Sequence, residues 1–400
     1  MSLGPLNTLL LALIVFLVGE LLNRRVYLFN KYCIPSPVIG GLLFAIIATL
    51  LSATDVYSVT IDTSLSSIFM LVFFTTIGLG ASFKLVKLGG KLLVIYWLCS
   101  GVLALMQNLI GVSFATLLGL DPLIGVMVGA TSMEGGHGAA TAFGQTVEEL
   151  GIDGALSIGL AAATMGLVGG GLLGGPVVRY LIEKHGLAPP AQDADQDTTQ
   201  SSIDSVQARN TTINEHNILV QLVIIFFCVQ VGTIVGDAFT SITGFALPGY
   251  VSCMFLAVII RNLVDLKSPQ FINMRCIGLI GNVSLAIFLS MALMSIDLMQ
   301  IRDLALPLIL IVLVQILFVA LFGIFIVFRL LGKNFDAAIM VAGFCGHGLG
   351  ATPNAIANMD AAAHKYGYSP TAFLVVPIVG AFLIDIFALP IIITTINIFS

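Results

Sequence analysis

Charged residues are scarce in this sequence. They make up 9% of its 400 residues, whereas soluble domains carry about 25%, and the mean hydropathy is +1.07. Too little polar surface remains to cover a water-facing molecule, which excludes a cytosolic enzyme, a secreted disulfide scaffold and a disordered chain. At roughly 20 residues for each crossing, the composition predicts an all-α polytopic membrane protein with about ten to twelve apolar segments.

Motifs of familiar chemistry are also missing. The six cysteines are scattered without a C-x-x-C pair, so neither a metal site nor a disulfide is predicted. Without an H-E-x-x-H or a G-x-S-x-G motif, an intramembrane protease or a serine hydrolase has no support. No basic patch indicates a nucleic-acid partner. We therefore expect a protein that is not an enzyme, has no cofactor and binds no nucleic acid.

Apolar runs fill most of the chain and fall into two sets of six. They cover 3–19, 34–54, 64–83, 92–120, 122–147, 154–178, 216–236, 240–260, 277–296, 304–328, 337–359 and 366–398. The first run has no Lys or Arg ahead of it and no cleavage site, so it predicts a span rather than a signal peptide. The polar stretch 183–216 predicts a cytoplasmic linker between an N-terminal half, 1–182, and a C-terminal half, 217–400.

The positions of the basic residues predict the topology, because cytoplasmic loops are enriched in Lys and Arg. If 122–147 crossed the membrane, Glu148 and Glu149 would lie inside and Arg179 and Lys184 outside, against this rule. A re-entrant segment removes the conflict, and Lys365 demands a second one at about 335–360. Each half then has five spans plus one re-entrant loop, every basic residue except Arg302 is cytoplasmic, and both termini are periplasmic.

Five spans is an odd number, so the two halves are expected to have opposite orientations. Similar segments occur in the same order in both halves: Pro35–Val38 with Leu247–Val251, Phe74–Leu79 with Phe288–Leu293, and Gly135–Thr141 with Cys345–Thr352. Inverted-topology repeats are typical of secondary transporters, whose substrate and ion sites lie near the membrane midplane between the repeats. The fold we predict is therefore a pair of inverted repeats.

The glycine-rich stretches 134–141 and 343–354 are the first candidates for the site. Backbone without helical hydrogen bonds is tolerated at membrane depth only inside protein or along a cavity. Unwound carbonyls suit Na⁺ and helix-end amides suit a carboxylate. The alternative is that these glycines only let hairpins pack closely, as we expect for Gly166, Gly170 and Gly174, which recur every four residues.

Glu134 and Asp385 interrupt apolar runs, and a mid-bilayer charge costs roughly 2.5–3.5 kcal/mol. This cost favours cation coordination or proton exchange over packed, protonated acids. The histidines in the two glycine-rich stretches have two readings, a ligand or a neutral ring that holds the loop by bonds to carbonyls. Neutral polar residues in apolar segments either bond between helices or line the site. The candidate site residues are Glu134, Gly135, Gly136, His137, Gly138, Thr141, Gly346, His347, Gly348, Gly350, Thr352, Pro353, Asn354, Asn358, Asp385, Asn282, Ser284, Thr75, Thr76, Gln107 and Asn108.

Five segments carry a resemblance to a known family. They are Ile34–Leu43, Met106–Asn108, Ser132–Gly138, Gly346–Met359 and Val375–Asp385. Through them the chain resembles, over nearly its whole length, the bacterial sodium/glutamate symporters of the glutamate:sodium symporter (ESS) family. The resemblance implies Na⁺-driven uptake of L-glutamate across the inner membrane, with Na⁺ as coupling ion. It also implies two oppositely oriented five-helix domains, each with a glycine-rich re-entrant loop, and a homodimer is compatible with it.

Two other functions stay open. Ala139 and Ala140 replace the Thr-Gly that is common in the family, and Glu134 adds a carboxylate that repels a substrate anion unless it is protonated or paired with a cation. These departures keep open a cation- or proton-coupled carrier of another small organic anion, such as aspartate or a dicarboxylate. Paired pore loops are also compatible with a channel, although an internal inverted duplication favours a carrier.

Overall fold

The computed structural model describes residues 2–31, 34–53, 60–189, 213–243, 247–267, 271–295 and 304–400. The predicted linker 183–216 lies mostly outside these ranges, as does Arg302. Within them the chain is helical except for a parallel pairing of β1 (Ser2–Leu3) with β2 (Thr60–Ile61). The N-terminal helices are α1 (Pro5–Arg25), α2 (Tyr27–Lys31), α3 (Ser36–Ala53), α4 (Ser66–Gly80), α5 (Phe83–Leu117), α6 (Pro122–Val128), α7 (Ala130–Met133), α8 (Gly136–Glu149) and α9 (Ala155–His185).

The second half of the chain is helical in the same manner. Its helices are α11 (Glu215–Thr243), α12 (Gly249–Lys267), α13 (Met274–Met294), α15 (Ala305–Phe322), α16 (Phe328–Leu330), α17 (Phe335–His347), α18 (Thr352–Tyr366), α19 (Pro370–Ile378) and α20 (Asp385–Phe399), with π-helical turns η3 (Gly323–Val327) and η4 (Val379–Leu383). In the described residues seven helices are long and apolar enough to cross a membrane. The predicted all-α polytopic membrane class is confirmed. The number of spans in each half and their inverted orientation stay predictions.

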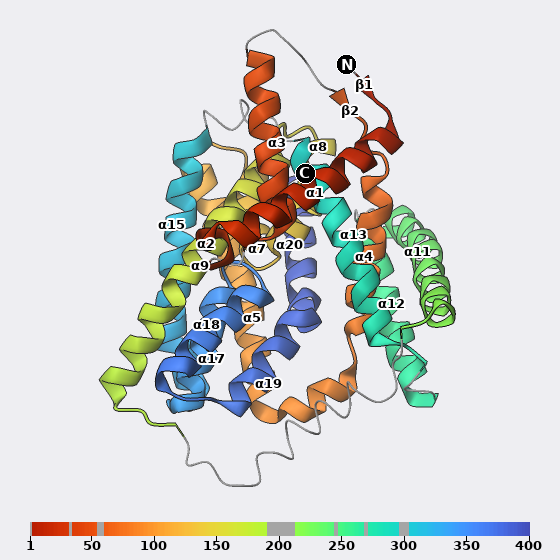
Figure 1. The fold of residues 1–400 in the computed structure, drawn as a ribbon. Coiled ribbons are helices and arrows are strands. Elements are labelled where there is room, and N and C mark those ends of the chain that lie inside the picture. The colour runs from red at the N-terminus through yellow and green to blue at the C-terminus, as the bar shows by residue number, and fades with distance from the viewer. Residues whose placement is uncertain are drawn as a thin grey trace.

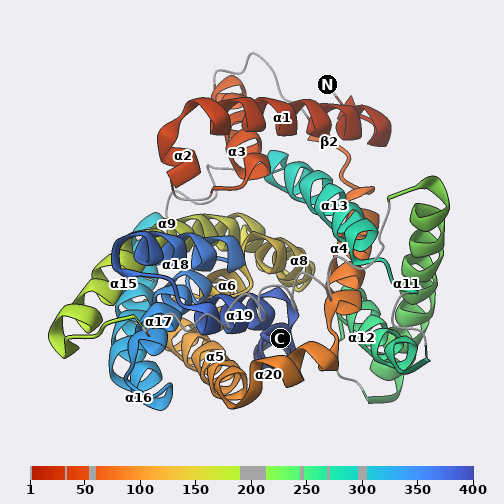
Figure 2. The same ribbon diagram turned by 60° about the horizontal axis from the view of Figure 1, so that its bottom comes forward.

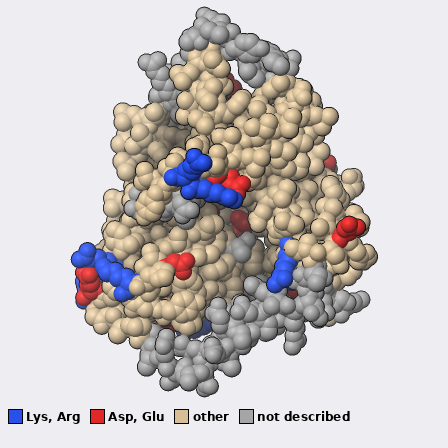
Figure 3. Space-filling model, in the orientation of Figure 1, with Lys and Arg blue, Asp and Glu red and all other residues tan. Residues whose placement is uncertain are grey.

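The helices form two bundles that lie side by side (Figures 1 and 2). The first bundle contains α1, α3, α4, α11, α12 and α13, and the second contains α5 to α9 and α15 to α20. Each bundle therefore takes helices from both halves of the chain. Large apolar side chains such as Leu10, Phe227 and Leu317 are exposed on the outer helices. Most of the face shown in Figure 3 is uncharged, and its Lys, Arg, Asp and Glu side chains gather in a few groups, near the centre and toward the left and right.

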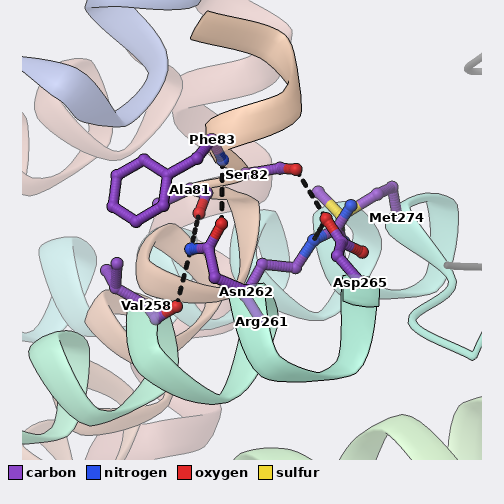
Figure 4. Close-up of polar contacts among 8 residues, drawn as sticks. All are labelled: Ala81, Ser82, Phe83, Val258, Arg261, Asn262, Asp265 and Met274. Atoms are coloured by element: carbon purple, nitrogen blue, oxygen red, sulfur yellow. Dashed lines mark hydrogen bonds and ion pairs between the residues drawn. The ribbon is translucent and has the colours of Figure 1, made fainter. Parts of the chain in front are cut away.

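A polar cluster joins α12 to the short segment between α4 and α5 (Figure 4). Asn262 Nδ2 donates to the Ala81 carbonyl at 2.8 Å. Ser82 Oγ and Arg261 Nε donate to the same carboxylate oxygen, Asp265 Oδ2, at 2.5 and 3.1 Å. The Arg261 and Asp265 side chains are only 10% and 4% exposed, so the pair is a buried one. These contacts fix the point where the chain leaves the first bundle and enters the second.

Side-chain caps fix where the interrupted helices of the second bundle begin. Asp121 accepts from the Leu123 amide at 2.8 Å at the start of α6, and Asn334 accepts from the Ala337 amide at 2.9 Å at the start of α17. Each cap satisfies an amide that has no partner within its helix. The two glycine-rich stretches therefore follow helices with defined starting points.

Candidate functional site

A cavity of about 570 Å³ lies between the two bundles. The second bundle contributes residues 134–139, His347, 351–353, Gly380, Ile384 and Asp385 to its wall, and the first contributes Phe16, 35–37, Phe73, Phe74, Ile77, Asn282, Leu285, Ala286 and Leu289. Its wall is mostly apolar, with a few polar groups. This composition is typical of a site that orients a small charged molecule with few contacts.

The cavity lies where two helix interruptions meet. The first separates α6, α7 and α8 between Gly129 and Gly136, and the second separates α17 from α18 at 348–351. Gly136 has a φ of +58°, and a Cβ placed on it would lie 2.6 Å from the Gly350 carbonyl oxygen. No side chain fits in this contact, so the backbones of the two interruptions touch. Glycine is required here for both its conformation and its size.

Neighbouring side chains of α5 hold the two interruptions. Asn108 Oδ1 accepts from the Ala130 amide at 3.0 Å, at the first interruption. Gln107 Nε2 donates to the Gly348 carbonyl at 2.6 Å, at the second. Both side chains are almost completely buried. They satisfy backbone groups that the interruptions leave without helical partners, which would otherwise cost about 1–3 kcal/mol each.

Two asparagines attach α18 to α9. Asn354 Nδ2 donates to the Leu167 carbonyl at 3.0 Å, and Asn358 Nδ2 donates to the Gly170 carbonyl at 3.0 Å. A Cβ on Gly170 would lie 3.0 Å from Asn354 Nδ2, and one on Gly174 would lie still closer to Asn358. The repeated glycines of α9 therefore form the surface on which the second interrupted pair packs, as their spacing predicts.

Glu134 is a buried carboxylate in the cavity wall. It is 5% exposed, and neither carboxylate oxygen has a hydrogen-bond partner within the described residues. Asp385 lines the same cavity and is half-buried. Burial of a charge without a partner is expensive. The arrangement suits a carboxylate that receives a cation or a proton from the cavity.

The two histidines have different environments. His137 Nε2 lies 3.0 Å from Thr164 Oγ1. That hydroxyl gives its hydrogen to the Leu160 carbonyl, so the imidazole is the donor. His137 thus holds the loop, as one reading predicts, but its partner is a hydroxyl rather than a carbonyl. His347 is 2% exposed, and its Nδ1 is buried without a hydrogen-bond partner within the described residues.

The cavity wall holds about half of the predicted site residues. Those in the wall are Glu134, Gly135, Gly136, His137, Gly138, Asn282, His347, Thr352, Pro353 and Asp385. Those elsewhere are Thr75, Thr76, Thr141, Ser284, Gly346, Gly348, Gly350, Gln107, Asn108, Asn354 and Asn358. The three threonines of this second set donate to carbonyls of their own helices.

Sequence reasoning overlooked some residues of the wall. The sequence identifies residues 35–37 only as part of a repeated segment and Gly380 only as part of Val375–Asp385, yet the structure places all four in the cavity wall. A Cβ on Gly380 would lie 2.5 Å from Thr352 Oγ1 and 3.2 Å from His347 Cε1. The Val375–Asp385 segment, which resembles the family, contains Gly380, but a single glycine in an apolar helix usually indicates helix packing.

The family model and the curated relatives that match this sequence agree on one family. A model of the sodium/glutamate symporter family matches residues 1–368. The chain is 42% identical over 385 residues to the sodium/glutamate symporter of Escherichia coli (strain K12), covering 96% of this chain and 95% of that protein. It is 38% identical over 381 residues to the sodium/glutamate symporter of Haemophilus influenzae, covering 95% and 94%. A sodium proton antiporter of Methanocaldococcus jannaschii aligns over 98% of both chains with 18% identity and a TM-score of 0.44.

Proposed function

This chain belongs to the sodium/glutamate symporter family, which is a family of transporters, and from that premise we propose that it carries L-glutamate into the cell together with Na⁺. The single observation that supports this function best is the meeting of two helix interruptions at a cavity that contains Glu134 and Asp385. Exposed carbonyls and carboxylates suit Na⁺, and exposed helix-end amides suit the carboxylates of glutamate.

We propose that the two interrupted pairs are re-entrant and enter from opposite faces. The contact pairs Gly346 with Ala355 and Gly343 with Met359 indicate that α17 and α18 run antiparallel. Gly159 of α9 lies against Met127 of α6 as well as α8, which supports a similar return at 122–147. With five spans in each half, this topology makes the halves inverted repeats and leaves both termini in the periplasm of a bacterial inner-membrane protein.

A second cavity supports alternating access. It has a volume of about 480 Å³, shares Phe73, Ile77 and Asn282 with the first, and extends along α4 and α13 toward Gly80 and Met274. Those helix ends are the ones that the basic residues assign to the cytoplasm. In our proposal this second cavity is the route of release to the inside, and rearrangement of one bundle against the other closes it.

The decisive experiment is uptake of labelled L-glutamate into proteoliposomes with an inward Na⁺ gradient, an inward proton gradient, or neither. Saturable uptake that requires Na⁺ supports the symporter, and a membrane potential adds about 2.3 kcal/mol for each elementary charge per 100 mV. Uptake that ignores Na⁺ contradicts the coupling. Competition by aspartate and dicarboxylates distinguishes a carrier of another anion. Unitary conductance steps would indicate a channel.

Oligomeric state is a separate part of the proposal. A homodimer is what we expect for the purified protein in detergent, and cross-linking in the native membrane tests it. Monomeric behaviour in both settings would remove the dimer without affecting the transport function.

A further inference from the structure

We propose that Trp97, which lies outside the cavity wall, is a positioning residue for Asp385 and through it sets the affinity of the transporter for Na⁺. The inference rests on the proposed function and adds a residue to its ion site. It depends on the π-helical turn η4, on the hydrogen bond that Trp97 makes to it, and on the position of Asp385 directly after that turn.

The turn η4 contains one more residue than an α-helical turn. The Ile384 amide donates to the Val379 carbonyl five residues earlier, at 3.1 Å. Beyond it, the Phe387 and Ala388 amides both donate to the Ile384 carbonyl, at 3.0 and 2.9 Å. An α-helix would pair the Phe387 amide with the Leu383 carbonyl. The π-helical turn therefore releases this carbonyl from the backbone ladder.

Trp97 donates a hydrogen bond to the Leu383 carbonyl that the π-helical turn leaves free. Its indole Nε1 donates to the Leu383 oxygen at 2.6 Å, and its ring lies against the Phe387 ring with centroids 4.7 Å apart. The partners are two residues before and two residues after Asp385. The Trp97 side chain of α5 thus contacts the backbone before Asp385 and the side chain of Phe387 after it.

The opposite side of η4 is fixed as well. Gly380 lies so close to Thr352 and His347 that a Cβ would come within 2.5 Å of the Thr352 hydroxyl. The turn is therefore held between α5 and the second interruption. Short π-helical turns occur often at functional sites, and here the turn sets the direction in which Asp385 leaves the helix.

Loss of the indole hydrogen bond has a specific consequence. The Leu383 carbonyl could then take the Phe387 amide and restore α-helical pairing. Conversion of the π-helical turn to α-helical pairing shifts the hydrogen-bond register by one residue, which rotates the following helix by about 100° about its axis. This rotation would direct the Asp385 carboxylate away from the cavity. Glutamate contacts that do not involve Asp385 would be retained, so the effect is expected on Na⁺ rather than on the substrate.

The test is Trp97→Phe, which keeps an aromatic ring against Phe387 but removes the donor. We expect the Na⁺ concentration for half-maximal glutamate uptake to rise about three- to tenfold, while the glutamate KM at saturating Na⁺ is unchanged. If Trp97 had only a structural role, the substitution would lower the maximal rate or the amount of folded protein, and it would not raise the Na⁺ half-saturation while leaving the glutamate KM unchanged. An unchanged Na⁺ half-saturation in the folded variant overturns the proposal.

Fluorescence provides a second measurement on the unmodified protein, because Trp97 is its single tryptophan. We expect Na⁺, but not K⁺ at equal ionic strength, to change the Trp97 emission. The matched control is Leu98→Trp in a Trp97→Phe background, since Leu98 is the next residue of α5 and is 50% exposed; its emission should ignore Na⁺. If Trp97→Phe does not fold, a wild-type emission that ignores Na⁺ overturns the proposal.

The two measurements separate this inference from the proposed function. Wild-type protein that shows no Na⁺-driven glutamate uptake contradicts the symporter. In that case a Na⁺-specific change in Trp97 emission would still support the link between Trp97 and the ion site, and its absence would overturn it.

Discussion

Replacing Gly136 by alanine tests the contact between the two helix interruptions. The added methyl would lie 2.6 Å from the Gly350 carbonyl oxygen, whereas ordinary contact begins at 3.4 Å, so the backbones must separate by about 0.8 Å. The φ of +58° adds a cost for any residue with a side chain. Left-handed strain and overpacking together predict a loss of about 2–5 kcal/mol of stability. A displacement of this size at the site predicts at least about a hundredfold slower uptake.

Gly186→Ala is the matched control. Gly186 follows α9 with a φ of +57°, and a Cβ there would meet no atom within 4 Å. This variant carries the backbone strain alone, about 1–2 kcal/mol, and should transport normally. Both variants are measured by thermal unfolding in detergent and by glutamate uptake in proteoliposomes, normalised to the folded protein. Equal uptake by the two variants would refute the contact between the interruptions.

Three further substitutions test separate parts of the argument. Glu134→Gln removes a carboxylate from the cavity and should raise the Na⁺ half-saturation of uptake about tenfold or more; identical ion and pH profiles would make Glu134 a packed, neutral acid. Gln107→Leu removes the donor to the second interruption and should lower stability by about 1–3 kcal/mol, whereas a normal melting temperature would contradict that hydrogen bond. Arg261→Met removes the buried Arg261–Asp265 ion pair and should cost about 3–5 kcal/mol. The same change at Arg179, whose ion pair is exposed, should cost about 1 kcal/mol or less, and equal losses would show that burial is not the cause.

The positions of the helix interruptions were predictable from the sequence, for a physical reason. Backbone without helical hydrogen bonds needs a protein environment at membrane depth, and the structure ends α17 at His347 and begins α8 at Gly136. Glycine density is not sufficient by itself, because the glycine-rich α9 remains one helix from Ala155 to His185. The burial of Glu134 in a cavity was predictable on similar grounds, because a charge in an apolar run requires a protein environment.

Other features depend on tertiary contacts that no local pattern encodes. Gln107 and Asn108 are adjacent in sequence, and polar residues in an apolar segment fit interhelical bonding or a site equally well; only the packing of α5 shows that each holds a different interruption. The π-helical turn η4 has no signature either, because Val379–Leu383 has the composition of an ordinary apolar helix. The one-residue shift in the hydrogen-bond register of η4 depends on the residues packed against the turn, among them Trp97 and Thr352.

The two side chains on α5 that hold the interruptions have a mechanical consequence. Residues 107 and 108 are consecutive, so their separation along the helix axis is about 1.5 Å in any conformation. A tilt or translation of α5 must carry both attachment points in the same direction and by nearly the same amount. The two interruptions, which supply one side of the cavity wall, are therefore attached to the same helix and move together when the second bundle rearranges against the first.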